Sequence, residues 1–156
     1  LQLGQCNCRV KNNCPLQGHC LTDNLLYKAS LSADLPNYST KVYKGISQHP
    51  FKLRYNNHKK AFNIKKYRND CELSKEVWRI KDKGGKFLIK WEILQQLNSY
   101  SPTSKRCALC MAEKLSIIQH EGDNLLNKRT EIISKCRHRN KFMLKKTSNK
   151  GKDDII

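Results

Sequence analysis

The stretch YKGISQHPFKLRYNNHKKAFNIKKYRNDCE, residues Tyr43–Glu72, decides how the chain is organised. It continues a strand-like run, Lys41–Tyr43, which Gly45 is expected to end. Ser47 is suited to capping a helix, and Pro50 is tolerated in the first turn of that helix. The residues that follow are therefore expected to be helical.

Two further features of this stretch carry chemistry. Arg54 and His58 stand four residues apart, so both project from the same face of the expected helix. Asp70 is expected to cap a second helix, ELSKEVWRIKDK at residues 72–83, with Glu72 in its first turn. A strand, a helix and the start of a second helix thus supply a tyrosine, an arginine, a histidine and a carboxylate. The plain alternative is a basic amphipathic helix followed by another helix.

The remaining elements follow from periodicity and turn residues. Residues 25–32, LLYKASLS, and residues 40–44 are expected to pair as a hairpin. KFLIKWEIL, residues 86–94, alternates apolar and polar positions and predicts a third strand. Helices are expected at residues 109–119 and within residues 125–135. This order predicts an α+β domain, a small three-stranded sheet flanked by helices, with Cys-rich appendages.

Positive charge is the strongest global signal. The chain has 156 residues, with 31 Lys and Arg against 13 Asp and Glu, and a formal net charge of +18. Residues 35–69 and 135–152 carry many cations and no acidic residue. Such clusters of positive charge favour a polyanion as the binding partner, usually nucleic acid, over an anionic membrane surface. No apolar run is long enough to span a membrane, no signal peptide is visible, and the start at Leu1 suggests a fragment of a longer polypeptide.

The first cysteine cluster lies in residues 6–20, CNCRVKNNCPLQGHC. This segment shows no apolar period and is too short to bury a core, so another interaction must hold it together. A tetrahedral zinc ion bound by four thiolates would do so, and His19 could replace one of them. Two local disulfides are the alternative. The expected ligands are Cys6, Cys8, Cys14 and Cys20.

A second cysteine cluster lies towards the other end of the chain. Cys107 and Cys110 form a C-x-x-C pair, and Cys136 and His138 follow them after a helix. Together they have the composition of a Cys3His structural zinc site, provided that the chain returns to this point. A redox-active C-x-x-C pair is the competing interpretation. Cys71 is left over and is expected to be buried as a small apolar side chain.

Two tyrosines on paired strands, an R-x3-H helix and a glutamate at the next helix start resemble the GIY-YIG nuclease family. More narrowly, the chain resembles the endonuclease domain that follows the reverse transcriptase in Penelope-like retroelements, in which a Cys-rich knot precedes the first tyrosine strand. The resemblance spans residues 6–144. It is carried by the phrases CPLQGHCL, LLYKA, YKG, FKLRYNNHKKAF, ELSKEVW, KRCALC and LNKRTEIISKCRHRNKF.

The family motifs can be matched residue by residue. Leu25–Tyr27 stands where the family has GIY, without its glycine, and Tyr43–Gly45 stands where it has YIG. Lys44 replaces the isoleucine and faces the opposite side of the strand from the tyrosine, so burial there would place an ammonium group in the core. The resemblance implies a catalytic set of Tyr27, Tyr43, Arg54, His58, Glu72 and Asn127.

The resemblance implies phosphodiester hydrolysis with one magnesium or manganese ion. Glu72 would hold that ion, and Arg54 would donate hydrogen bonds to the phosphoryl oxygens. One of the tyrosines would activate water, with His58 holding its hydroxyl or sharing the proton. Because a phenol has a pKa of about 10, neighbouring groups would have to lower it. Glu76, one turn beyond Glu72, is the rival metal ligand.

The resemblance also divides the chain into a zinc knuckle at 1–22, a nuclease domain at 23–144 and a basic flexible tail at 145–156. The expected partners are DNA, or RNA, and a linked reverse transcriptase upstream in a longer polypeptide, with no membrane involved. An intracellular, nuclear location follows from that substrate. Phosphate contacts are expected from Lys52, Lys59, Lys60, Arg137, Arg139 and Lys141.

Three hypotheses about function stay open at this point. The first is a metal-dependent endonuclease that nicks target DNA for retroelement integration, and the second is a catalytically decayed, zinc-stabilised nucleic-acid-binding module. The third is a cationic secreted disulfide protein, for which Asn37 begins a formal glycosylation sequon. Trp78 and Trp91 are expected in the core rather than on a surface that stacks bases.

Overall fold

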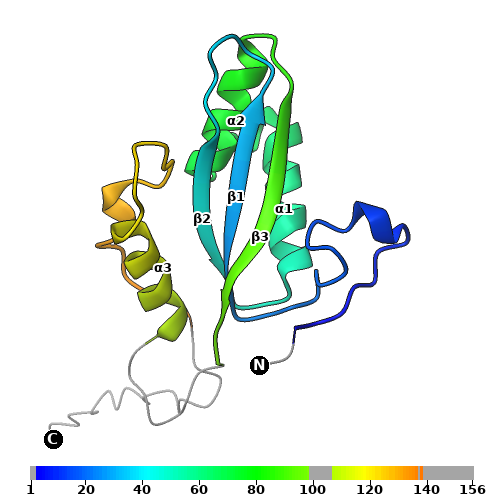
Figure 1. The fold of residues 1–156 in the computed structure, drawn as a ribbon, viewed down its shortest axis with the longest axis vertical. Helices are drawn as coiled ribbons and strands as arrows, with labels where there is room; N and C mark the ends of the chain where they lie inside the picture. Colours follow the sequence, from blue (N-terminus) through cyan, green and yellow to red (C-terminus); the bar gives the residue numbers. More distant parts are fainter. Residues whose placement is uncertain (1–2, 99–106, 137, 139–156) are drawn as a thin grey trace, which may run out of the picture.

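The computed structural model describes residues 3–98, 107–136 and 138. Within them a three-stranded sheet is flanked by helices, which confirms the expected α+β fold (Figure 1). None of the helices described has the length and apolar character needed to cross a membrane. The main elements are β1 (Leu25–Ala33), β2 (Lys41–Ser47), α1 (Phe51–Asn63), α2 (Glu72–Asp82), β3 (Phe87–Gln96) and α3 (Ala108–Ile118). Three-residue 3-10 helices lie at Lys11–Asn13, Lys65–Tyr67 and Arg129–Glu131.

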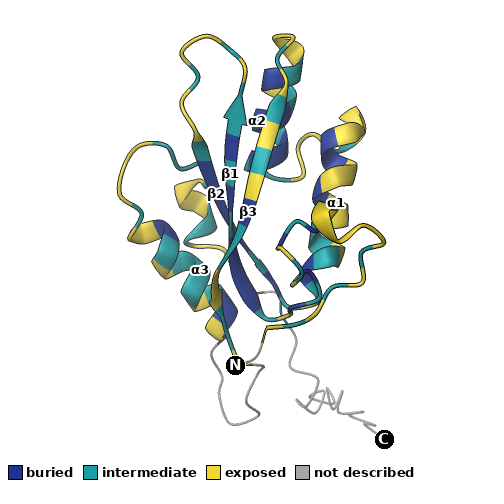
Figure 2. Cartoon of the chain, turned by 45° about the vertical axis from the view of Figure 1, so that its right-hand side comes forward, coloured by how far each residue is buried: buried dark blue, intermediate teal, exposed yellow. Residues whose placement is uncertain are grey.

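The sheet is antiparallel, with β1 in the centre between β2 and β3. Alternation along β1 puts Leu25, Tyr27, Ala29 and Leu31 on one face, and all four are fully buried. That face packs against the buried sides of α1 and α2, whose outer sides are exposed (Figure 2). The hairpin of β1 and β2 is confirmed, and the core lies on a single face of the sheet.

Gly45 does not end β2, which continues to Ser47, so that prediction was wrong. Gly45 pairs directly with Tyr27 on β1, and the tyrosine ring lies across the glycine backbone. A Cβ atom built on Gly45 would lie 2.5 Å from the Cζ atom of Tyr27. The glycine is therefore required by the close approach of a ring and not by a turn.

The start of α1 differs from the expected Ser47 cap. Ser47 still belongs to β2, and its hydroxyl donates to the carbonyl of His49. The first amide of the helix, at Phe51, instead donates to the carbonyl of Thr22 at 2.9 Å, and the next donates to that of Cys20 at 2.8 Å. The N-terminal Cys-rich segment thus satisfies amide groups that a helix start leaves without partners.

The helix α2 begins at Glu72, as expected, but its cap residue differs from the expected one. Cys71 is the N-cap residue, and its amide donates to the Ser74 hydroxyl at 3.1 Å, so Asp70 is not the cap. Cys71 is half-buried and belongs to this cap, which corrects the expectation of a buried core cysteine. Trp91 lies in the core as expected, whereas Trp78 is only half-buried on a side of α2 outside the core.

The free edge of β2 is covered by the segment that follows α3. The Val42 amide donates to the carbonyl of Asn124 at 2.9 Å, and the Leu126 amide donates to the carbonyl of Val42 at 2.7 Å. These bonds keep the chain extended here, so the last expected helix shrinks to the 3-10 turn Arg129–Glu131. An edge strand covered in this way offers no open row of backbone groups for another chain to pair with.

Lys44 is buried, with 8% of its surface exposed, as its strand position implied. Its ammonium group donates to the carbonyl of Ser116 at 2.9 Å. That carbonyl lies in the last turn of α3, where carbonyl groups lack intrahelical partners and carry the negative end of the helix dipole. The lysine therefore caps a helix instead of leaving a charge stranded in the core.

We expect Gly45→Ala to lower the free energy of unfolding by about 3 kcal/mol, because the added methyl group would overlap the Tyr27 ring. Urea denaturation followed by circular dichroism measures the loss. Gly84→Ala is the matched control, since Gly84 has a φ of 75° and open space around it. That variant bears only the strain of a left-handed backbone, about 1 kcal/mol. Equal losses in the two variants would contradict a steric requirement at Gly45.

Candidate active site and metal sites

The hydroxyl of Tyr27 lies at the centre of the candidate active site. It is 2.7 Å from Nε2 of His58, and Nε of Arg54 donates to it at 3.3 Å. Arg54 and His58 leave the same face of α1 one turn apart, as the spacing predicted, and the fold brings both to Tyr27 of β1. The three side chains form one hydrogen-bonded set across the interface of helix and sheet.

His58 is neutral in this environment. Its side chain is 3% exposed and is surrounded by the rings of Phe62 and Trp91. Burial, together with the nearby charge of Arg54, lowers the pKa of His58 to about 3. A neutral His58 has one ring nitrogen that accepts and one that donates, and the tautomer that accepts the Tyr27 hydroxyl proton at Nε2 carries its own proton on Nδ1, 3.9 Å from Sγ of Cys71.

Both candidate tyrosines are neutral phenols. Burial raises the pKa of Tyr27 to about 12, although the charge of Arg54 opposes the shift. Burial also raises the pKa of Tyr43 well above its ordinary value, with Tyr27 adding to the effect. Arg54 does act to lower both tyrosine pKa values, but burial is the larger effect, so the protein groups alone do not bring either pKa below its ordinary value.

The two tyrosines differ in what their hydroxyl groups can reach. Tyr27 is completely buried, and its hydroxyl is already bonded to His58 and Arg54. Tyr43 is 4% exposed, and within the described residues its hydroxyl makes no hydrogen bond. Tyr43 is therefore the phenol with capacity to bind a ligand, and Tyr27 is suited to holding Arg54 and His58 in place.

Glu72 stands in the first turn of α2, where the sequence placed it. Its Oε1 atom lies 2.9 Å from Nζ of Lys75 and 3.3 Å from Nζ of Lys128. Partial burial alone would raise the pKa of Glu72, but hydrogen bonds from the two lysines outweigh it and lower the pKa. Glu72 is therefore an ionised carboxylate, the form that binds a hard cation.

Glu76, the rival metal ligand, is fully engaged in the fold. Its side chain is 4% exposed, and it accepts hydrogen bonds from Tyr38 and Lys41, each at 2.9 Å. Nη1 of Arg79 lies 3.2 Å from its other oxygen. Three partners leave this carboxylate no free position for a metal, so Glu72 is the better candidate of the two.

Asn127 acts on the backbone of β2. Its Oδ1 atom accepts from the amide of Lys44 at 2.8 Å, and its Nδ2 group donates to the Lys44 carbonyl at 2.7 Å. The side chain thereby imitates one residue of a neighbouring strand. This pairing fixes the following residue, Lys128, beside Glu72, so Asn127 positions the site without touching the tyrosine hydroxyl groups.

A cleft of about 910 Å³ opens beside Arg54 between α1 and α3. Asn57 from α1 and Glu113 from α3 line it, together with His49 from the loop before α1. Burial and the nearby charge of Glu131 raise the pKa of Glu113 to about 7. Sequence reasoning missed Glu113, because a single glutamate in a helix carries no signal that it faces a cleft.

The first cysteine cluster converges as its spacing predicted. The four Sγ atoms lie within 4.8 Å of one another, and those of Cys8 and Cys20 are 3.7 Å apart. A tetrahedral zinc site with Zn–S bonds of about 2.3 Å places its sulfur atoms roughly 3.8 Å apart. His19 bonds to the carbonyl of Gly4 and is outside the group. The cluster fits zinc, with the ligands Cys6, Cys8, Cys14 and Cys20.

The second cluster forms around the imidazole of His138. Its Nδ1 atom lies 3.4 Å from Sγ of Cys107, 3.2 Å from that of Cys110 and 3.5 Å from that of Cys136. All eight cysteines of the chain are free thiols, so neither cluster is a disulfide. Three thiols and an imidazole within ligand distance favour a structural metal over a redox-active pair.

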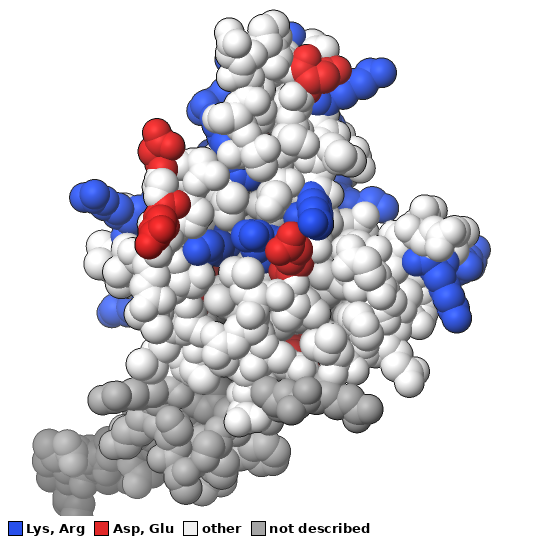
Figure 3. All heavy atoms as spheres, viewed as in Figure 1, with Lys and Arg blue, Asp and Glu red and all other residues white. Residues whose placement is uncertain are grey.

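The expected phosphate contacts can be placed only in part. Lys59 and Lys60 are exposed on α1, and Lys52 is half-exposed near its start. Arg137, Arg139 and Lys141 lie outside the described residues, as does the tail 145–156. Figure 3 shows basic side chains spread over one face of the molecule among few acidic ones.

This arrangement can bind and polarise an anionic group. Arg54 lines the cleft while Tyr27 holds its Nε, and Tyr43 and Glu72 supply a neutral hydroxyl and an ionised carboxylate. Comparison with known proteins adds no assignment, because no family model, curated protein or solved structure matches the chain. The function is therefore inferred from the residues and their geometry.

We expect the stabilising effect of His58 to fade in mild acid. Its pKa is about 3 in the fold, against an ordinary value of 6.5 for an exposed histidine. The unfolded chain therefore binds the proton first, and stability falls as the pH drops below 6.5. Between pH 7 and pH 5 the free energy of unfolding of the unaltered chain should fall by about 2 kcal/mol more than that of His58→Gln. Urea unfolding of both proteins measures this, and parallel pH profiles would contradict a neutral His58.

We expect the chain to bind two zinc ions, one at each cluster, because each cluster offers four ligand atoms. Native mass spectrometry counts them. Cys14→Ser should remove one ion, whereas Cys71→Ser, which changes a cysteine outside both clusters, should remove none. A mass that shows paired disulfides in place of zinc would overturn this prediction.

Proposed function

We propose that the chain is a metal-dependent endonuclease of the GIY-YIG type that hydrolyses phosphodiester bonds in DNA. One observation carries the proposal: Tyr27, His58 and Arg54 form a hydrogen-bonded set at the edge of a cleft. Under this proposal the enzyme nicks target DNA so that a linked reverse transcriptase can prime there, and it works in the nucleus.

In this proposal Arg54 binds the phosphoryl oxygens. Its Nε is already committed to Tyr27, which leaves the terminal nitrogens of the guanidinium group for the substrate. Tyr27 and His58 keep the guanidinium plane in one orientation, because both lie in the rigid, buried interface. Such fixed donors stabilise developing charge without reorganising during the reaction.

Tyr43 and Glu72 complete the proposed site. A magnesium or manganese ion held by Glu72 would polarise the phosphodiester. Lys75 and Lys128 keep the Glu72 carboxylate ionised until such an ion replaces them. The unpaired hydroxyl of Tyr43 would orient the attacking water. As a neutral phenol it is suited to hydrogen bonding, and proton removal then requires a further group of the assembled complex.

The second candidate function is binding without cleavage. It is supported by the raised pKa of both tyrosines and by the two lysines that already neutralise Glu72. A catalytically decayed, zinc-stabilised module would keep the net charge of +18 and the metal clusters, and so would still bind nucleic acid.

Nicking of supercoiled plasmid in magnesium or manganese tests the nuclease proposal. We expect conversion to open circles, and we expect Glu72→Gln to slow it by at least about 100-fold with DNA binding unchanged. Glu92→Gln is the matched control, because Glu92 is a carboxylate on β3 that also pairs with two lysines. Tight binding without nicking by the unaltered chain would favour the decayed module.

A further inference from the structure

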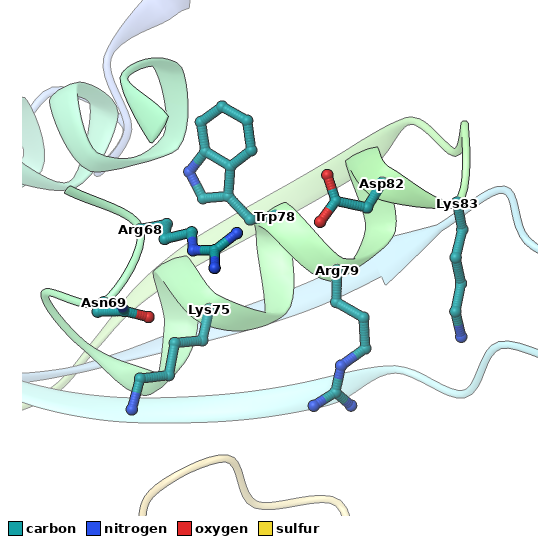
Figure 4. A pocket seen from close by; sticks show the side chains of 7 residues that line it. All are labelled: Arg68, Asn69, Lys75, Trp78, Arg79, Asp82 and Lys83. Carbon is teal, nitrogen blue, oxygen red and sulfur yellow. The ribbon is translucent and has the colours of Figure 1, made fainter. Parts of the chain in front are cut away.

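The outer side of α2 carries a groove that the candidate active site does not use. Its volume is about 360 Å³. It is walled by Trp78 and by four cations, with Asp82 as its one acidic residue (Figure 4). The four cations are Arg68, Lys75, Arg79 and Lys83.

Three of these cations form a regular row. Lys75, Arg79 and Lys83 recur every four residues, so they lie on one side of α2 and about 6 Å apart along its axis. Figure 4 shows the three side chains leaving the helix towards the same side. A row of evenly spaced cations matches a ligand whose negative charges also repeat along a line.

Trp78 provides a rigid wall of the groove. Its indole Nε1 donates to the carbonyl of Ala61 on α1 at 2.7 Å, which fixes the ring. The ammonium group of Lys81 lies 4.5 Å from the ring centroid. The groove is thus held in shape by the contact of α1 with α2 and needs no ligand to form.

Two of the four cations have no acidic partner in the described part of the chain. Lys75 pairs with Glu72, and Arg79 pairs with Glu76. The side chains of Arg68 and Lys83 are exposed and make no ion pair within the described residues. Even with Asp82 counted against these two positions, the groove keeps a net positive charge.

We propose that this groove binds the sugar-phosphate backbone of nucleic acid, as a second contact surface outside the cleavage site. Lys75 borders the groove and also contacts Glu72, so the groove begins where the candidate active site ends. A strand with its reacting phosphate at Glu72 would continue along α2; this direction rests on the proposed nuclease function. Binding itself depends only on the charges of the groove.

Nucleic acid fits better than an acidic peptide. The groove offers a row of cations and one fixed ring, and within the described residues its lining contains no aliphatic side chain to receive peptide anchors. Phosphate contacts by Lys and Arg also match a chain whose net charge is +18.

Salt-dependent binding of a fluorescein-labelled 30-base-pair DNA duplex, followed by anisotropy, tests the proposal. Arg68→Ala/Lys83→Ala should weaken binding about tenfold at 0.1 M salt and lower the slope of log K against log salt by roughly 2. Arg68→Lys/Lys83→Arg should restore both values. The control Lys11→Ala/Lys90→Ala removes the same charge from exposed sites elsewhere, and it should change the affinity and the salt slope far less.

Two results would contradict the proposal that this groove binds nucleic acid. In one, both alanine pairs weaken DNA binding equally, which would show that only net charge matters. In the other, the Arg68/Lys83 pair loses binding of labelled polyglutamate but keeps that of DNA, which would assign the groove to acidic protein. A nicking assay at saturating protein concentration separates the two proposals. If the unaltered chain does not nick DNA, the nuclease proposal fails, while the binding measurements still test whether the groove binds DNA.

Discussion

A buried phenol hydroxyl imposes the constraint on which this structure depends. The hydroxyl of Tyr27 has no access to water, and a buried polar group without partners costs several kcal/mol. It is satisfied by a neutral histidine on one side and an arginine on the other. The ring can reach both only because Gly45 leaves room on the neighbouring strand. The packing of the domain and the orientation of Arg54 therefore follow from the same contact.

Two glutamates on α2 differ in their surroundings, and this difference makes one of them structural and leaves the other available to a ligand. Glu76 is buried against Tyr38, Lys41 and Arg79, and it joins α2 to the strand and loop beside it. Among the described residues Glu72, one turn earlier, is held by two lysines at the edge of the fold. Ion pairs with exposed lysines contribute little to stability, so a ligand can displace them at small cost. The accessible carboxylate is the one suited to binding.

The two cysteine clusters lie where the chain has little core to hold it together. The N-terminal segment contributes few buried side chains, yet its carbonyl groups bond the first amides of α1, the helix that carries Arg54. The second cluster includes Cys107, which caps the start of α3, and α3 brings Glu113 to the cleft. Metal at both clusters would therefore stabilise both walls of the cleft. In a domain of this size such links replace contacts that a larger core would provide.

The sequence by itself determined the three strands, the helices α1, α2 and α3 and most local groupings, but not the end of β2 or the short turn after α3. Alternation placed the buried face of β1, helical spacing placed Arg54 beside His58, and cysteine spacing predicted both clusters. Most of these features depend on residues close together along the chain, which local spacing reports directly, whereas the second cluster also required the chain to return from Cys110 to Cys136. The tertiary structure alone decided the partners of Lys44 and Asn127, which tyrosine hydroxyl His58 holds, and the half-buried position of Trp78 on its groove. Each depends on atoms from distant segments, and no local pattern encodes which surfaces those segments will bring together.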